Sequence, residues 1–196
     1  MTEIPLFPLR SVLLPYGRMG LRVFEQRYLD LVARCLKEDE GFGVVWIRQG
    51  SEVKQPNADT PHLAQLGTCA RIVDWNSQPN GLLGIVIAGS RRFRMLSSHQ
   101  TDNGLHMAQV EWLDDEAAEP LPDYAQPLCD LLRQLTEHPQ VARLGYRAEC
   151  DSVTELTCVL TQLLPVEESI KFALLSANDA ATRLEQLIAL LDHLGQ

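Results

Sequence analysis

The order of apolar and polar residues changes from an extended pattern to a helical one near the start of the chain. Residues 4–14 are mostly apolar but include Pro5 and Pro8, which exclude a helix interior and favour an edge strand or a bend. The apolar residues that follow recur at steps of three and four along one face, so they predict one amphipathic helix that ends near Gly41. These residues are Phe24, Tyr28, Leu31, Val32 and Cys35.

Short apolar runs bounded by turn residues follow this helix. Their length and their β-branched content predict strands joined by hairpins. Together with one helix, such strands form a small curled sheet or barrel. The polar segment 51–65 is the longest predicted loop, and long loops within compact domains often carry function. The predicted strands are residues 42–47, 66–75, 82–89, 91–98 and 105–113.

The later part of the chain has a helical pattern. An apolar stripe from Tyr124 to Leu135 predicts one helix. Ser152 and Glu155 have capping-box spacing at the start of a second helix, where they satisfy its first amides. A third helix is predicted to hold Pro165 in its first turn, and a last one to begin at about Asn178.

These patterns predict an α+β fold in two parts. Residues 1–113 form a β-rich subdomain, a β-barrel or curled sheet with one helix, and residues 122–196 form an α-helical bundle. Residues 114–121, which are acidic and contain proline, form the junction. No internal repeat divides the chain further.

The charge is distributed unevenly between these two parts. The net charge of the 196 residues is −9, with +1 in residues 1–112 and −10 in residues 113–196. A near-neutral first part and a strongly acidic second part indicate two compositional units. The net negative charge also repels nucleic acid at long range.

The composition predicts a cytoplasmic protein that does not enter a membrane. The hydrophobic content of 45% is enough for a sizeable core, and no uncharged apolar run has the length of a membrane span. The first ten residues lack the pattern of a secretory signal. The five cysteines are widely spaced and lack a CxxC pair, so neither a disulfide framework nor a zinc site is indicated.

Several motifs occur in a fixed order along the chain. PLFPL and LRVFEQRYLDLV lie near the start, followed by FGVVWIRQGSEV, LGTCARI and the RFR of residues 92–94. ALLSANDAATRLEQLIALL occupies residues 173–191. Taken together, and across essentially the whole chain, these segments resemble the amino-terminal domain of Lon proteases, the Lon substrate-binding domain.

The resemblance implies a PUA-like barrel that carries a helical bundle and recognises unfolded or exposed protein segments. The ATPase module of Lon is not expected in these residues, because no Gly-Lys pair occurs and a phosphate-binding loop of the GxxxxGK type needs one. The peptidase module is not expected either, because none of the three lysines lies in a motif like that of the peptidase. The chain therefore resembles a stand-alone recognition domain. We expect a non-enzymatic protein with no cofactor and no metal, whose partners are protein or peptide segments and a separate protease.

Exposed apolar groups are what such a domain needs to bind varied segments, because burial of apolar surface supplies affinity without sequence specificity. Tyr16 and Met19, on a glycine-rich loop, and residues of the 51–65 loop are the candidates. The alternative is that they close the end of the barrel. Two interpretations also exist for the start of the helix, at Glu25, Arg27 and Tyr28. These residues form either a binding feature or a structural salt bridge, and the structural interpretation is preferred.

Arg91, Arg92 and Arg94 surround Phe93 in the only dense basic cluster, which suggests a second function, a nucleic-acid-binding PUA-like module. Strand alternation places Arg92 and Arg94 on one face and Phe93 on the other, in the core, which weakens a base-stacking platform. A third alternative is an enzyme with an unrecognised site. The cysteines favour core packing over catalysis, and only His99 and His106 are placed to face each other across a hairpin.

Overall fold

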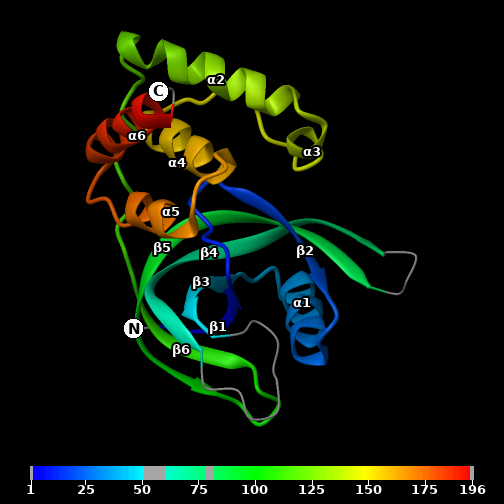
Figure 1. Ribbon diagram of the computed structural model, residues 1–196. Coiled ribbons are helices and arrows are strands. Elements are labelled where there is room, and N and C mark those ends of the chain that lie inside the picture. Colours follow the sequence, from blue (N-terminus) through cyan, green and yellow to red (C-terminus); the bar gives the residue numbers. More distant parts are fainter. Residues whose placement is uncertain (1, 51–60, 78–81, 195–196) are drawn as a thin grey trace. The chain divides into compact units, whose positions relative to one another are not determined.

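The computed structural model describes residues 2–50, 61–77 and 82–194. It divides into two compact units by the packing of its Cα atoms. Unit 1 takes in Met1–Leu13 and Arg18–Asp114, and unit 2 takes in Leu14–Gly17 and Asp115–Gln196. Figure 1 labels the helices and strands of both units.

Unit 1 is a six-stranded mixed sheet that curls into a near-barrel. The strands follow the order β2-β5-β4-β3-β1-β6, and a further pairing of β5 with β6 closes the ring. The β1–β3 pair is parallel, whereas the other pairs are antiparallel. The elements are β1 (Thr2–Leu9), β2 (Arg18–Val23), α1 (Gln26–Glu38), β3 (Phe42–Gln49), β4 (His62–Ser77), β5 (Leu83–Gln100) and β6 (His106–Trp112).

The long strand β5 makes the closure possible, because it serves two different neighbours. Its first part pairs with β2 and its second part pairs with β6, while β4 runs beside both. The prediction of two separate strands at 82–89 and 91–98 is therefore wrong. Gly89 pairs with Ala70 of β4, and a bulge between Thr68 and Ala70 absorbs the change of register instead of a turn.

Helix α1 is amphipathic as predicted, but it starts later than the apolar spacing suggests. Its buried face includes Tyr28, Leu31, Val32 and Cys35. Phe24 was predicted on this face and is instead 56% exposed, because the helix begins at Gln26. The tyrosine ring of Tyr28 stacks on Phe7 of β1, with 3.9 Å between the ring centroids. This contact joins the helix to the first strand.

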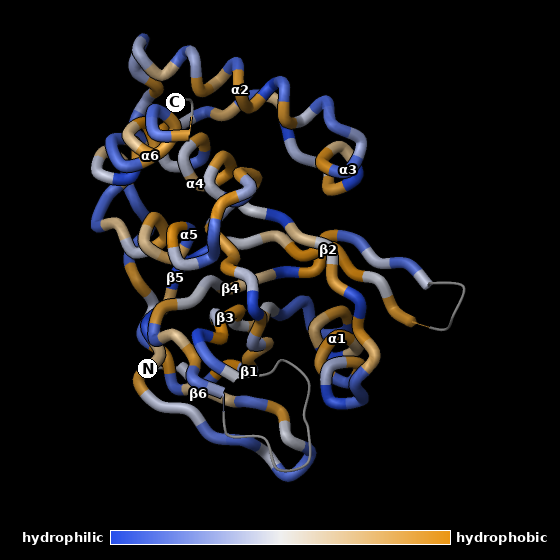
Figure 2. The backbone as a smooth tube through the Cα atoms, viewed as in Figure 1, coloured by the Kyte–Doolittle hydropathy of each residue, from blue (hydrophilic) through white to orange (hydrophobic). Residues whose placement is uncertain are grey.

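The core of unit 1 lies inside the curled sheet. Phe42 and Phe93 are fully buried there, and the burial of Phe93 agrees with the strand alternation expected around it. Close packing leaves no room for side chains at some backbone positions. A Cβ at Gly67 would lie 2.6 Å from both the carbonyl oxygen of Val44 and the Phe93 ring. Figure 2 shows the alternation of apolar and polar residues along the strands of this unit.

Unit 2 is helical, and most of its predicted helices are present. Ser152 accepts a hydrogen bond from the amide of Glu155 at 3.2 Å, which confirms the predicted N-cap. Two details were wrong: Tyr124 is 68% exposed in a short 3-10 turn, and Pro165 precedes the third predicted helix, which begins at Glu168. The elements are η1 (Asp123–Ala125), α2 (Gln126–Glu137), α3 (Pro139–Ala142), α4 (Val153–Leu163), α5 (Glu168–Leu175) and α6 (Ala180–Leu194).

A buried arginine ties the start of unit 2 to its last helix. Arg183 of α6 is fully buried and donates two hydrogen bonds to the carboxylate of Glu116, one of them at 2.8 Å. Its third donor bonds the carbonyl oxygen of Leu174 at 3.0 Å. Residues 14–17 join the same unit, since the amide of Leu14 donates to the side chain of Gln162 at 2.9 Å.

The predicted α+β fold, a curled sheet with one helix followed by a helical region, is confirmed. The predicted boundaries of the two subdomains, 1–113 and 122–196, stay a prediction. Within the described ranges, no helix is long and apolar enough to cross a membrane.

Candidate functional pocket

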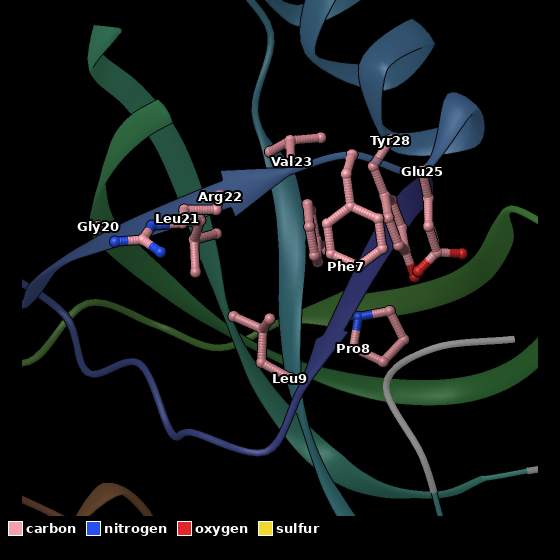
Figure 3. A pocket seen from close by; sticks show the side chains of 10 residues that line it. Phe7, Pro8, Leu9, Gly20, Leu21, Arg22, Val23, Glu25 and Tyr28 are labelled. Carbon is pink, nitrogen blue, oxygen red and sulfur yellow. The ribbon is translucent and has the colours of Figure 1, made fainter. Parts of the chain in front are cut away.

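A pocket of about 180 Å³ opens in unit 1 between β1, β2 and the start of α1. Apolar side chains dominate its lining, and Figure 3 shows them converging from the three elements. The cavity is large enough for one branched or aromatic side chain, because a cavity of about 150 Å³ holds a benzene molecule. The lining residues are Phe7, Pro8, Leu9, Gly20, Leu21, Arg22, Val23, Phe24, Glu25 and Tyr28.

A rigid polar cluster supports the pocket beside the start of α1. Arg27 is buried, forms an ion pair with Glu25 at 2.9 Å and donates to the carbonyl oxygen of Gly104 at 2.7 Å. Its guanidinium also lies 4.5 Å from the centre of the Tyr28 ring. The salt bridge predicted at the helix start is therefore present. These partners are all internal to unit 1, so the cluster fixes the start of α1 beside the pocket.

The two apolar residues proposed from the sequence fall in different units. Tyr16 belongs to unit 2, is 49% exposed and has a left-handed backbone with φ of 61°. Partial burial is the main cause that raises the pKa of its hydroxyl above the ordinary value. Met19 was predicted on a glycine-rich loop but lies on strand β2 in unit 1, next to the pocket residue Gly20, and packs partly against the core. Their role in binding stays a proposal.

The other candidate segment was the polar loop 51–65. Its residues 51–60 lie outside the described residues. The prediction is wrong for residues 62–65, which belong to strand β4, because β4 begins at His62.

The arginine cluster of β5 is engaged by its own unit. Arg91 donates to the carbonyl oxygen of Leu113 at 2.8 Å, and its guanidinium lies 5.8 Å from the Trp112 ring centre. Arg94 pairs with Glu111 of β6 at 3.6 Å. Arg92 is half-buried on the same strand. Arg91 and Arg94 thus already have internal partners that a phosphate would have to displace.

Four of the five cysteine thiols are poor nucleophiles near neutral pH. Burial raises the pKa of Cys35 to about 11 and that of Cys150 to about 12. Burial also raises the pKa values of Cys69 and Cys129. All five cysteines are free thiols. Because the thiolate is the reactive form, these shifts favour a packing role for the four thiols concerned.

The predicted pairing of His99 with His106 is wrong by one residue. His106 of β6 lies opposite Gln100, and His99 lies opposite Met107. The side-chain nitrogen of Gln100 is 2.9 Å from Nε2 of His106. Burial, helped by the charge of Arg27, lowers the pKa of His106. Across the described ranges, no three His, Cys, Asp or Glu side chains gather in a way that could hold a metal ion.

Most residues of the pocket were not predicted from the sequence. Phe7 and Leu9 were predicted only as parts of the extended segment 4–14, no strand was predicted at Leu21 and Val23, and Phe24 was assigned to a buried helix face. The alternation of Met19, Leu21 and Val23, which all pack on the core, was the available signal for a separate strand. That signal was short and interrupted by glycine.

The fold defines the class of this protein as an α+β domain with a curled mixed sheet and a helical continuation. The family model described as the ATP-dependent protease La (LON) substrate-binding domain matches residues 3–193. The chain belongs to this family, as the sequence motifs predicted. Because the match takes up nearly all of the 196 residues, they hold neither an ATPase nor a peptidase domain.

Full-length relatives align over almost the whole chain. The Lon proteases of Cytophaga hutchinsonii and Escherichia coli K12 are each 27% identical, over 96% and 97% of this chain, respectively. The chain spans about a quarter of the length of these curated relatives, since it covers 24% of each.

Two solved structures are similar to the chain as a whole. The Lon N-terminal domain protein from Xanthomonas campestris is 35% identical with a TM-score of 0.72, and the match covers 96% of this chain and 98% of that one. The N-terminal domain of the Mycobacterium avium complex Lon protease has a TM-score of 0.58 at 13% identity, over 96% and 97% of the two chains. The second likeness supports the fold alone.

Proposed function

We propose that this domain binds unfolded or exposed segments of other proteins and catalyses no reaction on them. The observation that carries the proposal is the match of residues 3–193 to the substrate-binding domain of an ATP-dependent protease. The apolar pocket in unit 1 supports it, because burial of apolar side chains is the interaction that an unfolded chain offers and a folded one hides.

The proposed partners are protein segments, which the domain would present to a protease, and the proposed location is the cytoplasm. Exposed apolar side chains beside the pocket suit this role. Phe24 lines the pocket and is 56% exposed, and Met19, which is half-buried, precedes the pocket residues on β2. Tyr16 offers a further exposed ring in unit 2. We propose Phe24 and Met19 as a binding surface of unit 1, and Tyr16 as a separate candidate in unit 2.

The experiment compares unfolded and folded forms of one client. Fluorescein-labelled α-lactalbumin, reduced and carboxymethylated so that it stays unfolded, is titrated with the domain, and fluorescence anisotropy is recorded. Saturable binding of the unfolded form but not of native α-lactalbumin is expected. If neither form binds, or if both bind equally, the proposal is wrong.

A matched pair of variants links the binding to the pocket. Phe24→Ser removes an exposed ring at the pocket and should weaken binding of the unfolded client. Leu36→Ser is the control, because Leu36 is 45% exposed in the same unit but does not line the pocket. A double variant Tyr16→Ser/Met19→Ser tests the other two residues. Unchanged binding in the double variant would remove them from the surface.

The nucleic-acid alternative has less support. The internal partners of Arg91 and Arg94 reduce the charge available to phosphates, and the net charge of −9 opposes approach of nucleic acid. RNA retention that depends on salt and is lost in an Arg92→Ala/Arg94→Ala double variant would reverse this ranking.

A further inference from the structure

The pocket lies along the edges of two strands, and the sequence of its lining residues shows this. Successive side chains of a strand point to opposite faces, so a pocket on a sheet face is lined by every second residue. This pocket is lined instead by the consecutive residues Phe7–Leu9 of β1 and Gly20–Val23 of β2. It therefore occupies a space between two strand edges.

The edge of β2 is unpaired. Within the described residues, β2 pairs with β5 only and ends the strand order of the sheet. Every second residue of an antiparallel edge strand directs its N–H and C=O groups away from its partner. Gly20 and Arg22 are exposed, and β2 contains no proline, so this edge retains its hydrogen-bonding groups. Such an edge is a template for another strand.

The edge of β1 that faces the pocket is less able to pair with an added strand. β1 pairs with β6 up to Leu6, whereas Leu6–Leu9 pair with β3 on the other side. One edge of Phe7–Leu9 thus has no strand partner among the described strands, and Pro8 removes an amide donor from this segment. An added strand would pair with β2 and would leave β1 as an apolar wall.

The charge at the pocket identifies a preferred feature of the occupant. Arg22 lines the pocket and is exposed, and no ion pair holds its guanidinium within the described part of the chain. The other charged lining residue, Glu25, is already paired with Arg27. The remaining charge at the pocket is therefore positive and complements a carboxylate.

We propose that an extended peptide segment adds as a strand to the free edge of β2, seats one apolar side chain in the pocket and places an acidic side chain near Arg22. This inference rests on the proposed function and specifies how the segment is held. Strand addition suits a domain with varied clients, because main-chain hydrogen bonds supply affinity without reading sequence. The pocket and Arg22 supply a preference for acidic-apolar segments.

The test uses peptides altered in the backbone. The probe is a fluorescein-labelled peptide of about seven residues, the length of a typical strand, with alternating valine and threonine, a central phenylalanine and one glutamate. Two N-methylated forms of the peptide are made. In one form the odd-numbered amides carry methyl groups, and in the other form the even-numbered amides carry them. In a paired strand only one of these two sets of amides faces β2, so one form should bind about tenfold more weakly and the other should bind like the parent.

A charge exchange tests the position of the acidic side chain. Arg22→Glu should weaken binding of the glutamate peptide several-fold and strengthen binding of a peptide with lysine in its place. Arg143→Glu is the matched control, because it makes the same change of charge at an exposed arginine of unit 2. The tryptophan fluorescence of each variant confirms that unit 1 remains folded.

The outcomes separate this inference from the proposed function. If both N-methylated forms bind like the parent peptide, the segment is not held as a strand and the inference is wrong. If carboxymethylated α-lactalbumin binds but the parent peptide does not, the proposed function is supported and the inference of strand addition at β2 is wrong. If neither probe binds, both are wrong.

Discussion

Each unit buries one arginine, and the two arginines are held in different ways. Arg183 of unit 2 is fully buried, with Glu116 and the carbonyl oxygen of Leu174 as partners for its donors. Arg27 of unit 1 is 8% exposed, pairs with Glu25 and Gly104, and keeps a buried Nε without a partner among the described groups. Unit 2 is thus satisfied internally where unit 1 is not.

The difference extends to the backbone of the two units. A helix satisfies its own backbone groups, whereas a curled sheet satisfies them only where strands meet. Unit 1 leaves the edge of β2 open beside an apolar pocket. In the proposed strand addition, a bound segment would complete the pairing that unit 1 leaves unfinished at this edge. The comparison also indicates which substitutions should affect one unit more than the other.

The largest effect is expected from Arg183→Ala. Removal of the guanidinium leaves the carboxylate of Glu116, which is 10% exposed, without its ionic partner. Breaking a buried ion pair costs about 3–5 kcal/mol of the free energy of unfolding. Urea denaturation followed by circular dichroism at 222 nm measures this loss. Arg143→Ala, at an exposed arginine of the same unit, should change stability by no more than about 0.5 kcal/mol.

A smaller effect is expected from Gly67→Ala in unit 1. The added methyl group would lie 2.6 Å from the carbonyl oxygen of Val44, a backbone atom that cannot move aside freely. Overpacking of this kind costs about 1–3 kcal/mol. Tryptophan fluorescence reports it, because Trp46, Trp75 and Trp112 all lie in unit 1. Ser97→Ala on exposed β5 is the control, and an equal effect of both changes would contradict the packing argument.

Ser152→Ala should have an effect of about 1 kcal/mol on unit 2, because the Ser152 hydroxyl caps the first amides of α4. The loss should be visible in the circular dichroism transition. Ser169→Ala provides a comparison, since the exposed Ser169 contacts only a neighbouring carboxylate. Equal stability of the two variants would show that the cap contributes nothing.

The smallest expected effect is a pH dependence of the stability of unit 1 that is caused by His106. Burial lowers the pKa of His106 in the folded state, so the unfolded state binds a proton more readily. Stability from this group is present above the ordinary histidine pKa of about 6.5 and is lost as the pH falls. The urea midpoint of tryptophan fluorescence should drop between pH 7.5 and pH 5.5, and His106→Gln should reduce that drop. If His106→Gln leaves the drop in the urea midpoint unchanged, groups other than His106 cause the pH dependence.

The helices could be predicted because their signals are local. Tyr28, Leu31, Val32 and Cys35 share one face within two turns, and Ser152 reaches the amide of Glu155 three residues away. The errors occurred at helix ends. Phe24 matches the helical period but lies before the first turn, where periodicity no longer determines which side chains are buried.

The extent of the strands and the site could not be predicted in the same way. β5 continues through Gly89 because β4 runs beside both of its parts, and a local turn signal does not report a neighbour. The pocket brings residues 7–9 together with residues 20–23, and neither segment carries a motif for the other. The two arginines Arg91 and Arg94 formed a cluster in the sequence, but the partners that engage them lie on and just after β6.

The amino-acid sequence by itself determined the α+β class, the family and the helical stripes, because these depend on residue order over a few turns or on motifs spread along the chain. Only the tertiary structure decided which edge stays open and which arginine is fully enclosed. Strand closure and the pairing of Arg183 with Glu116 join residues far apart in the chain. Such contacts depend on how the whole sheet and the helices pack, which no local pattern specifies.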